Sequence, residues 1–193
     1  MATKRAAGKN AAQAWIELRT TDPEAESALG VIRAHTGAGR QVRALRRLRL
    51  LELAGPLPAR AALEALLHRS IQFYNPHKER CSVRTAASDA APIDADEQVV
   101  LVWERNGERR EAAERWWRHE TGQEIVVREG VAWVLGLEPG TGNPAQAVED
   151  LAVVRDRRHG LFCNPHAQEC RIAAGSPPIP WMGATEKPRE ARG

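Results

Sequence analysis

Asn75-Pro76-His77-Lys78-Glu79-Arg80-Cys81 is the stretch that organises this sequence, because the chain repeats it as Asn164-Pro165-His166-Ala167-Gln168-Glu169-Cys170. Asn, Pro, His and Cys match in place, and an apolar residue (Val83 or Ile172) follows two positions after each Cys. Upstream, Pro58-Ala59-Arg60-Ala61 corresponds to Pro144-Ala145-Gln146-Ala147, and each precedes a short segment with helical spacing of apolar residues. The sequence therefore predicts an internal duplication of a helix followed by a hairpin.

The Asn-Pro pair in each copy predicts a turn without any chemistry. Asn75 and Asn164 are suited to accept a backbone N–H two residues further on. Pro76 and Pro165 preset the backbone dihedral of the first turn position. In this structural interpretation, the His of each copy bonds a backbone carbonyl across its hairpin.

The His and Cys of the two copies also suggest a metal site. Together His77, Cys81, His166 and Cys170 offer two nitrogens and two sulfurs, which is a tetrahedral zinc set. This zinc hypothesis requires the two hairpins to meet, and alternation along a strand can point a His and a Cys to opposite faces. Cys163 takes the place of Tyr74 in the first copy, so we expect it to be a buried apolar residue outside the set.

A catalytic Cys-His pair in the same hairpins is an alternative to the metal. It requires a thiolate whose pKa is lowered by a neighbouring imidazole in an exposed cleft. The residues around Cys81 and Cys170 match no local sequence signature of such a nucleophile.

The first third of the chain is predicted to be helical. Asp22 is a suitable cap and Pro23 a suitable first residue for a helix that runs to Thr36. The apolar spacing of residues 40–54 also fits a helix, with Gly55 as its stop. Further helices are expected over residues 11–19 and 58–68, which gives a helical segment over residues 11–69 after a disordered N-terminus at residues 1–10.

The rest of the chain reads as hairpins and helices. Strands are expected at residues 70–74, 80–84 and 99–103, and Asn106-Gly107 is a strong hairpin signal. Two strands at 124–127 and 131–135 flank Glu129-Gly130, helices are expected at 111–119 and 145–154, and a last hairpin spans 160–171. The predicted fold class is α+β: an N-terminal helical segment, then a mixed domain of antiparallel hairpins with helices on one face at 70–174, then an extended C-terminal tail at 175–193.

The charge distribution points to the N-terminal part as the place where an anionic partner docks. The net charge is +3, and residues 1–50 hold more basic than acidic residues whereas the remainder holds more acidic ones. Arg40, Arg43, Arg46 and Arg47 form either a solvated face of a core helix or, in a nucleic-acid-associated protein, the contact to phosphates. Base readout is not expected, since the following helix at 58–68 offers Arg60 as its one early basic side chain.

Composition favours a protein of the reducing cytoplasm. The three cysteines cannot all pair among themselves, and no apolar segment resembles a secretory signal or reaches the length of a transmembrane helix. We therefore expect a non-enzymatic cytoplasmic binding or accessory protein that acts through protein–protein contacts, with a structural zinc attached to that hypothesis. Its partner surface would include the basic N-terminal part. The Pro177-Pro178-Ile179-Pro180-Trp181 tail is expected to dock either on that partner or back on its own domain. The alternatives are a nucleic-acid-associated protein and a small enzyme that uses the His and Cys of the repeated hairpins.

Overall fold

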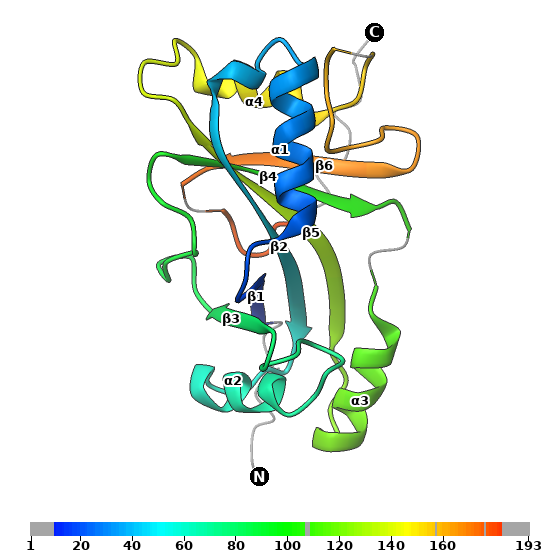
Figure 1. Cartoon of the computed structure of the whole chain (residues 1–193). Helices are drawn as coiled ribbons and strands as arrows, with labels where there is room; N and C mark the ends of the chain where they lie inside the picture. Colours follow the sequence, from blue (N-terminus) through cyan, green and yellow to red (C-terminus); the bar gives the residue numbers. More distant parts are fainter. Residues whose placement is uncertain (1–9, 107–108, 157, 176, 183–193) are drawn as a thin grey trace, which may run out of the picture.

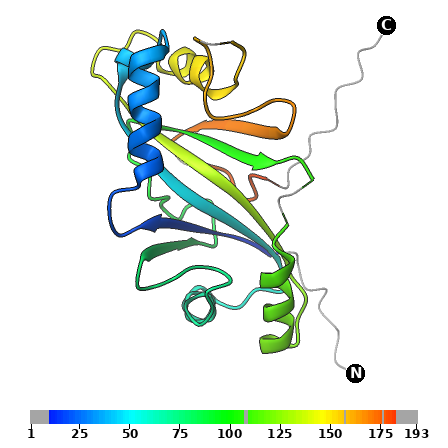
Figure 2. The ribbon, with the colours of Figure 1, turned by 45° about the vertical axis from the view of Figure 1, so that its right-hand side comes forward.

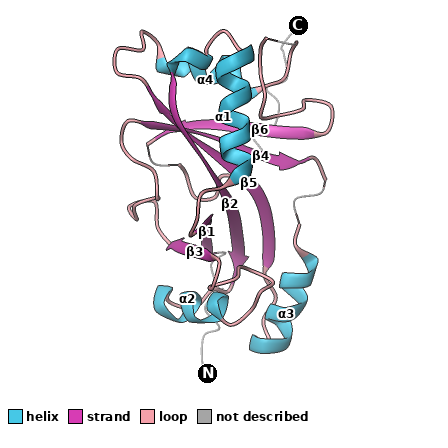
Figure 3. Ribbon diagram, viewed as in Figure 1, coloured by secondary structure: helices cyan, strands magenta, loops and turns pink. Residues whose placement is uncertain are grey.

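The computed structural model describes residues 10–106, 109–156, 158–175 and 177–182 and has an α+β fold (Figure 1). Helices and strands alternate along most of the chain (Figure 3). Their order is β1 (Asn10–Leu18), α1 (Pro23–His35), the 3-10 helix η1 (Gly39–Gln41), β2 (Val42–Gly55), α2 (Arg60–His68), β3 (Glu79–Arg84), β4 (Glu97–Glu104), α3 (Glu111–Thr121), β5 (Val126–Leu137), α4 (Pro144–Ala152) and β6 (Gln168–Ala174).

The strands form one antiparallel sheet in the order β3-β1-β2-β5-β4-β6. We call residues 10–84 the first half and residues 97–174 the second half. Each half runs strand, helix, strand, helix, strand, and the corresponding strands hold corresponding places on either side of the β2–β5 pair. The middle of the sheet is therefore the boundary between the halves.

The register of the sheet is also the same in both halves. Arg49 of β2 pairs with Val131 of β5 at the centre. In the first half, Ile16 pairs with both Arg49 and Cys81. In the second half, Val102 pairs with both Val131 and Cys170. One row of residues thus crosses the whole sheet: Cys81, Ile16, Arg49, Val131, Val102 and Cys170.

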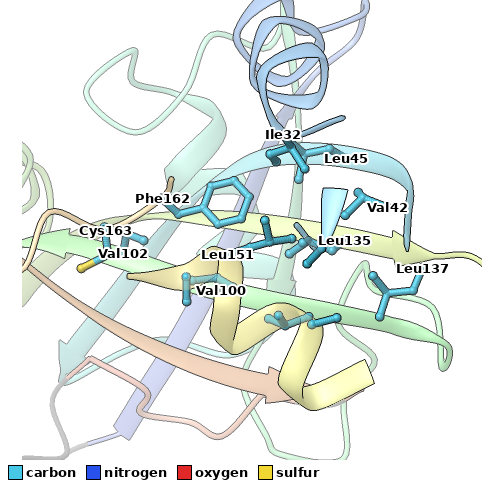
Figure 4. Close-up of a cluster of buried hydrophobic side chains, with 14 residues drawn as sticks. Ile32, Val42, Leu45, Val100, Val102, Leu135, Leu137, Leu151, Phe162 and Cys163 are labelled. Carbon is cyan, nitrogen blue, oxygen red and sulfur yellow. The ribbon is translucent and has the colours of Figure 1, made fainter. Parts of the chain in front are cut away.

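The helices cover one side of the sheet in two pairs, each with one helix from each half (Figure 2). Helices α1 and α4 pack at one end through Ile32 and Leu151 (Figure 4). Helices α2 and α3 pack at the other end through Leu67 and Trp117. Because side chains alternate along a strand, every second residue of β2 and β5 faces these helices.

The opposite side of the sheet is covered by loops and by the C-terminal tail. Trp181 and Met182 pack there with Trp15 of β1, next to the partly buried Ile93 of the β3–β4 loop. The buried carboxylate of Glu52 accepts the backbone N–H groups of Trp181 and Met182. Of the two alternatives for the Pro-Trp tail, the structure shows docking on its own sheet.

The expected N-terminal helical segment needs correction. Residues 11–19 and 40–54 lie mostly in β1 and β2, while α1 and α2 form as predicted. Strand β2 has leucines at both parities because both of its faces are buried, for example Leu48 and Leu51. Apolar residues on both faces of a strand imitate the three-to-four spacing of a helix. At α1, the Asp22 carboxylate does accept the N–H of Glu24, at 2.9 Å, as the capping pattern predicted.

Four expected hairpins also differ from the structure. Residues 126–137 form the single strand β5, so no turn occurs at Glu129-Gly130. Strand β4 leads into α3 rather than into a hairpin at Asn106-Gly107, and Gly107 itself lies outside the described residues. Residues 70–74 and 160–167 are turns and irregular backbone, so each repeated motif precedes an edge strand instead of joining two strands. The predictions for residues 1–9 and 183–193 lie outside the described residues.

Candidate functional site: the central strip of the sheet

The two Asn-Pro-His motifs form the same turn. Asn75 Oδ1 accepts the His77 N–H at 3.1 Å, and Asn164 Oδ1 accepts the His166 N–H at 3.1 Å. The residue that begins the edge strand closes each turn from the other side. The Asn75 N–H donates to the Glu79 carboxylate at 2.6 Å, and the Asn164 N–H donates to the Gln168 amide oxygen at 2.9 Å.

The neighbouring strand anchors both turns in the same way. The Arg19 N–H, just after β1, donates to Lys78 O at 2.8 Å, and the Arg105 N–H, just after β4, donates to Ala167 O at 2.8 Å. The guanidinium groups of these arginines donate to the carbonyls of Pro76 and Pro165 at 3.2 and 3.3 Å. These bonds account for Asn in both motifs. The turns use the backbone N–H groups of His77 and His166, whose side chains are exposed.

The structure does not bring the four expected zinc ligands together. His77 and Cys81 lie at the β3 edge of the sheet, and His166 and Cys170 lie at the β6 edge. Five strand spacings of about 4.8 Å separate Cys81 from Cys170, which places them about 24 Å apart. The expected shared set is therefore corrected on this point, and within the described residues no group of three or more His, Cys, Asp or Glu is arranged to hold a metal ion.

The cysteines of the motifs are protonated thiols at neutral pH. Burial raises the pKa of Cys81 to about 12, with the Glu64 carboxylate adding to the effect. Burial, with the neighbouring Cys163 thiol, raises the pKa of Cys170 to about 12. A catalytic nucleophile needs the opposite shift, so these positions give the enzyme alternative no activated thiolate.

The basic set expected to contact phosphates does not form one surface. Arg43 and Arg46 pair with Asp96 at 3.4 Å and Glu97 at 2.7 Å. Arg47 pairs with Glu24 at 2.6 Å and faces the helices, whereas the adjacent Arg46 faces the tail side. Arg40 lies apart in η1. Strand alternation and internal ion pairs thus disperse a cluster that looked continuous on a helix.

Between the two helix pairs lies a band of the sheet that we call the central strip. It consists of the helix-side residues of β2 and β5 around the central row, namely Arg47, Arg49, Glu129, Val131 and Trp133. Val131 and Trp133 are only half-buried, in contrast to the fully buried leucines on either side. The strip has a first end toward β3 and a second end toward β6.

The first end of the strip is filled by side chains of the chain itself. The Arg49 guanidinium donates to the Glu79 carboxylate at 3.0 and 3.2 Å and to the Glu129 carboxylate at 3.2 Å. It also donates to Phe73 O at 3.1 Å. The Phe73 ring lies edge-on to Trp116 and Trp117 of α3, with centroid distances of 5.6 and 6.3 Å.

The second end of the strip is open. A cavity of about 320 Å³ is lined there by Glu24, Arg47, Val102, Trp103, Glu104, Glu129, Gly130, Val131, Trp133, Phe162 and Gln168. The rings of Trp133 and Phe162 stack with centroids 5.0 Å apart, and the Arg47 guanidinium lies 5.9 Å from the Trp133 ring centre. The cavity volume falls in the range of about 300–1,000 Å³ that is usual for ligand sites.

An ion pair with exchanged charges links the strip to the helix starts of both halves. Asp22 caps α1 and pairs with Arg47 at 3.4 Å, and Arg110 takes the cap position of α3 and pairs with Glu129 at 2.7 Å. Arg47 and Glu129 are equivalent, because each stands two residues before the central Arg49–Val131 pair. Both halves thus have an ion pair between a strand residue and the residue that precedes a helix. The strand residue is basic in the first half and acidic in the second.

Comparison with known proteins gives no match. No family model, no curated protein and no solved structure matches the chain. No family assignment follows, so the residues themselves have to indicate the function. Among the described residues, no helix has the length and apolar character needed to cross a membrane.

Sequence reasoning missed the residues of the cavity. Trp133, Phe162 and Glu104 were placed in separate hairpins, and only the pairing of β5 with β4 and β6 with β4 brings them together. The one available signal was within the repeat, where Gln168 replaces the acidic Glu79 at a position that otherwise keeps its role.

Proposed function

We propose that this chain is a non-enzymatic binding protein and that it holds a protein partner at the central strip of its sheet. The observation that carries the proposal is the open second end of the strip, with its half-buried Val131 and Trp133 beside a cavity of about 320 Å³. Half-buried aromatic and aliphatic side chains in a concave place are typical of binding surfaces.

The chemistry of the described side chains supports binding over catalysis. The pKa of the motif thiols is raised. The side chains of His77 and His166 are exposed, and the turns are closed by the Asn side chains and backbone N–H groups. The two other surfaces expected to meet a partner are also occupied, because the tail packs on Glu52 and the arginines of β2 are paired with carboxylates. The central strip, by contrast, keeps an open cavity at its second end.

We infer further that the two halves arose by internal duplication. The repeated turn, the equal order of elements and the common register about Arg49 and Val131 support this inference. In that view one copy kept a scaffold with a filled strip end, while the other kept the same scaffold with an open one.

The experiment is affinity capture from a lysate of the source organism with three forms of the chain: wild type, Val131→Arg in the strip, and Val31→Arg as a matched control. Val31 is 40% exposed on α1 and lies outside the strip, so the control adds the same side chain elsewhere. We expect one protein to be retained by wild type and control and lost with Val131→Arg, and the purified pair to reproduce this by calorimetry. A chain that retains nothing and converts a substrate would overturn the proposal.

A further inference from the structure

The first end of the strip shows how this scaffold holds a guanidinium group. The Arg49 side chain is 25% exposed and lies between the carboxylates of Glu79 and Glu129. Its Nη2 also donates to the Phe73 carbonyl at 3.1 Å. The chain thus binds one of its own guanidinium groups with two carboxylates and one carbonyl, beside an aromatic ring.

The second end has the same frame without that group. Val131 stands opposite Arg49 in the central row, Gln168 takes the turn-closing place of Glu79, and Arg47 takes the place of Glu129. Phe162 precedes the second motif by two residues, as Phe73 precedes the first. The shorter Val131 side chain leaves open the volume that a guanidinium occupies in the first half, and the cavity lies there.

The helix above each end agrees with this difference. The sixth and seventh residues of α3 are Trp116 and Trp117, which pack over Phe73. The sixth and seventh residues of α1 are Ala28 and Leu29, which pack in the cluster of Phe162. Smaller side chains on α1 leave room above the second end.

The charges around the cavity favour a cation. Three carboxylates line it, at Glu24, Glu104 and Glu129. Glu24 pairs with Arg47 at 2.6 Å, and Glu129 pairs with Arg49 at 3.2 Å and with Arg110 at 2.7 Å. Glu104 is therefore the lining carboxylate that is open to a cation. The Glu104 carboxylate accepts the Gln168 amide N–H at 2.7 Å, which holds it at the cavity. A carboxylate beside stacked aromatic rings suits a planar cation, which can donate to the carboxylate and contact the rings at once.

We propose that this cavity binds the guanidinium group of an arginine side chain presented by the protein partner. The proposal rests on the function proposed above and names the chemistry of its partner. Glu104 accepts from the guanidinium in place of the Glu79 carboxylate of the first half, and Trp133 and Phe162 supply the aromatic surface. Lysine fits less well, because its ammonium is a compact, strongly hydrated charge without a planar face.

The test is calorimetric titration of the full chain with small probes. N-acetyl-arginine amide is the ligand, and the amides of N-acetyl-citrulline and N-acetyl-lysine are the neutral isostere and the alternative cation. We expect the arginine probe to bind about tenfold more tightly than citrulline, because the charge-assisted hydrogen bonds are lost with the neutral group. Equal binding of arginine and citrulline, or no binding of arginine, overturns the proposal.

Variants assign the binding to the cavity. Val131→Arg supplies a guanidinium in cis, as Arg49 does in the first half, and is expected to abolish probe binding. Glu104→Gln changes a side chain at the end of β4 and is expected to weaken binding by about fivefold through loss of one charged acceptor. Glu169→Gln is its control, since Glu169 pairs with Trp103 in the register and faces the other side of β6. Should Val131→Arg fail to fold, Glu104→Gln against Glu169→Gln still decides: equal binding by those two variants overturns the site.

The two proposals fail separately. Probe binding that depends on Glu104 supports the arginine site whether or not a partner is captured. A partner that is retained equally by wild type and Glu104→Gln, with no probe binding, overturns the arginine site and leaves the binding function standing.

Discussion

The two ends of the central strip stand on the same backbone frame and carry different side chains. At the first end Arg49 bridges Glu79 and Glu129 beneath Trp116 and Trp117. At the second end Val131 and Gln168 line a cavity beneath the smaller residues of α1. The turns, their anchoring arginines and the sheet register are common to both ends. The difference teaches that the repeated motif builds the frame, whereas the residues outside the motif decide what the frame holds.

The largest expected difference between the ends is in the packing of the helices. Trp117→Ala removes a fully buried ring and is expected to lower the free energy of unfolding by about 3–5 kcal/mol. Leu29→Ala, at the same position of α1, is expected to cost about 1 kcal/mol because that side chain is only half-buried. Urea denaturation of both variants measures this, and equal losses would contradict a filled end and an open end.

A smaller difference is expected at the central pair itself. Arg49→Ala leaves the Glu79 and Glu129 carboxylates without their shared partner and is expected to cost about 2–3 kcal/mol. Val131→Ala, its neighbour in the row, is expected to cost less than about 1 kcal/mol, since it removes two half-buried methyl groups. The same denaturation measurement separates them, and a costlier Val131→Ala would reverse the assignment of the two ends.

The turns should respond alike, because they are the part that the ends share. Asn75→Ala and Asn164→Ala each remove one side-chain acceptor and are expected to cost about 1 kcal/mol. His77→Ala and His166→Ala are expected to stay within about 0.5 kcal/mol, as for other exposed positions. Large losses on replacing either histidine would show that its side chain supports the turn.

A further effect, which the two edge strands share, is expected at high pH. In the unfolded chain the thiols have a pKa of about 8.5. In the folded chain burial raises the pKa of Cys81 and Cys170 to about 12. Between those values the unfolded state binds fewer protons, so stability is fully present below about pH 8.5 and falls as the pH rises toward 12. Denaturation at pH 7 and pH 10 should show a smaller loss for Cys81→Val plus Cys170→Val than for wild type, and equal losses would show that these thiols ionise normally.

Much of the local structure could be predicted from the sequence. The Asp22 cap, the turns at Asn75 and Asn164, and helices α1 to α4 follow from short-range chemistry. The central strands could not, because β2 is buried on both faces and its leucines lie at both parities. Glu129-Gly130 looked like a turn, yet Glu129 faces Arg49 and Arg110 across the strip. Gly130 is required by close packing rather than by a turn, because an added Cβ would lie 2.9 Å from Leu101 Cδ1 and 3.2 Å from Met182 Sδ.

The candidate site was hidden for the same reason. The cavity exists because β5 pairs with β2 and β4, and the sequence gives no rule for such pairing between distant strands. The same point separates the four residues expected to share a zinc ion, since the register puts Cys81 and Cys170 at the two ends of one row. A closer comparison of the copies would have drawn attention to Glu79 and Gln168, where the frame is kept and the charge is lost.

The most direct test of an occupied and an open end is a nuclear magnetic resonance titration with N-acetyl-arginine amide. The indole N–H signals of Trp133 at the second end and Trp116 at the first end are assigned by single replacement with phenylalanine. The structure predicts a saturable shift of the Trp133 signal with one probe per chain and an unmoved Trp116 signal. A saturable shift of Trp116, or no shift of Trp133, would contradict the division of the strip into a filled end and an open end.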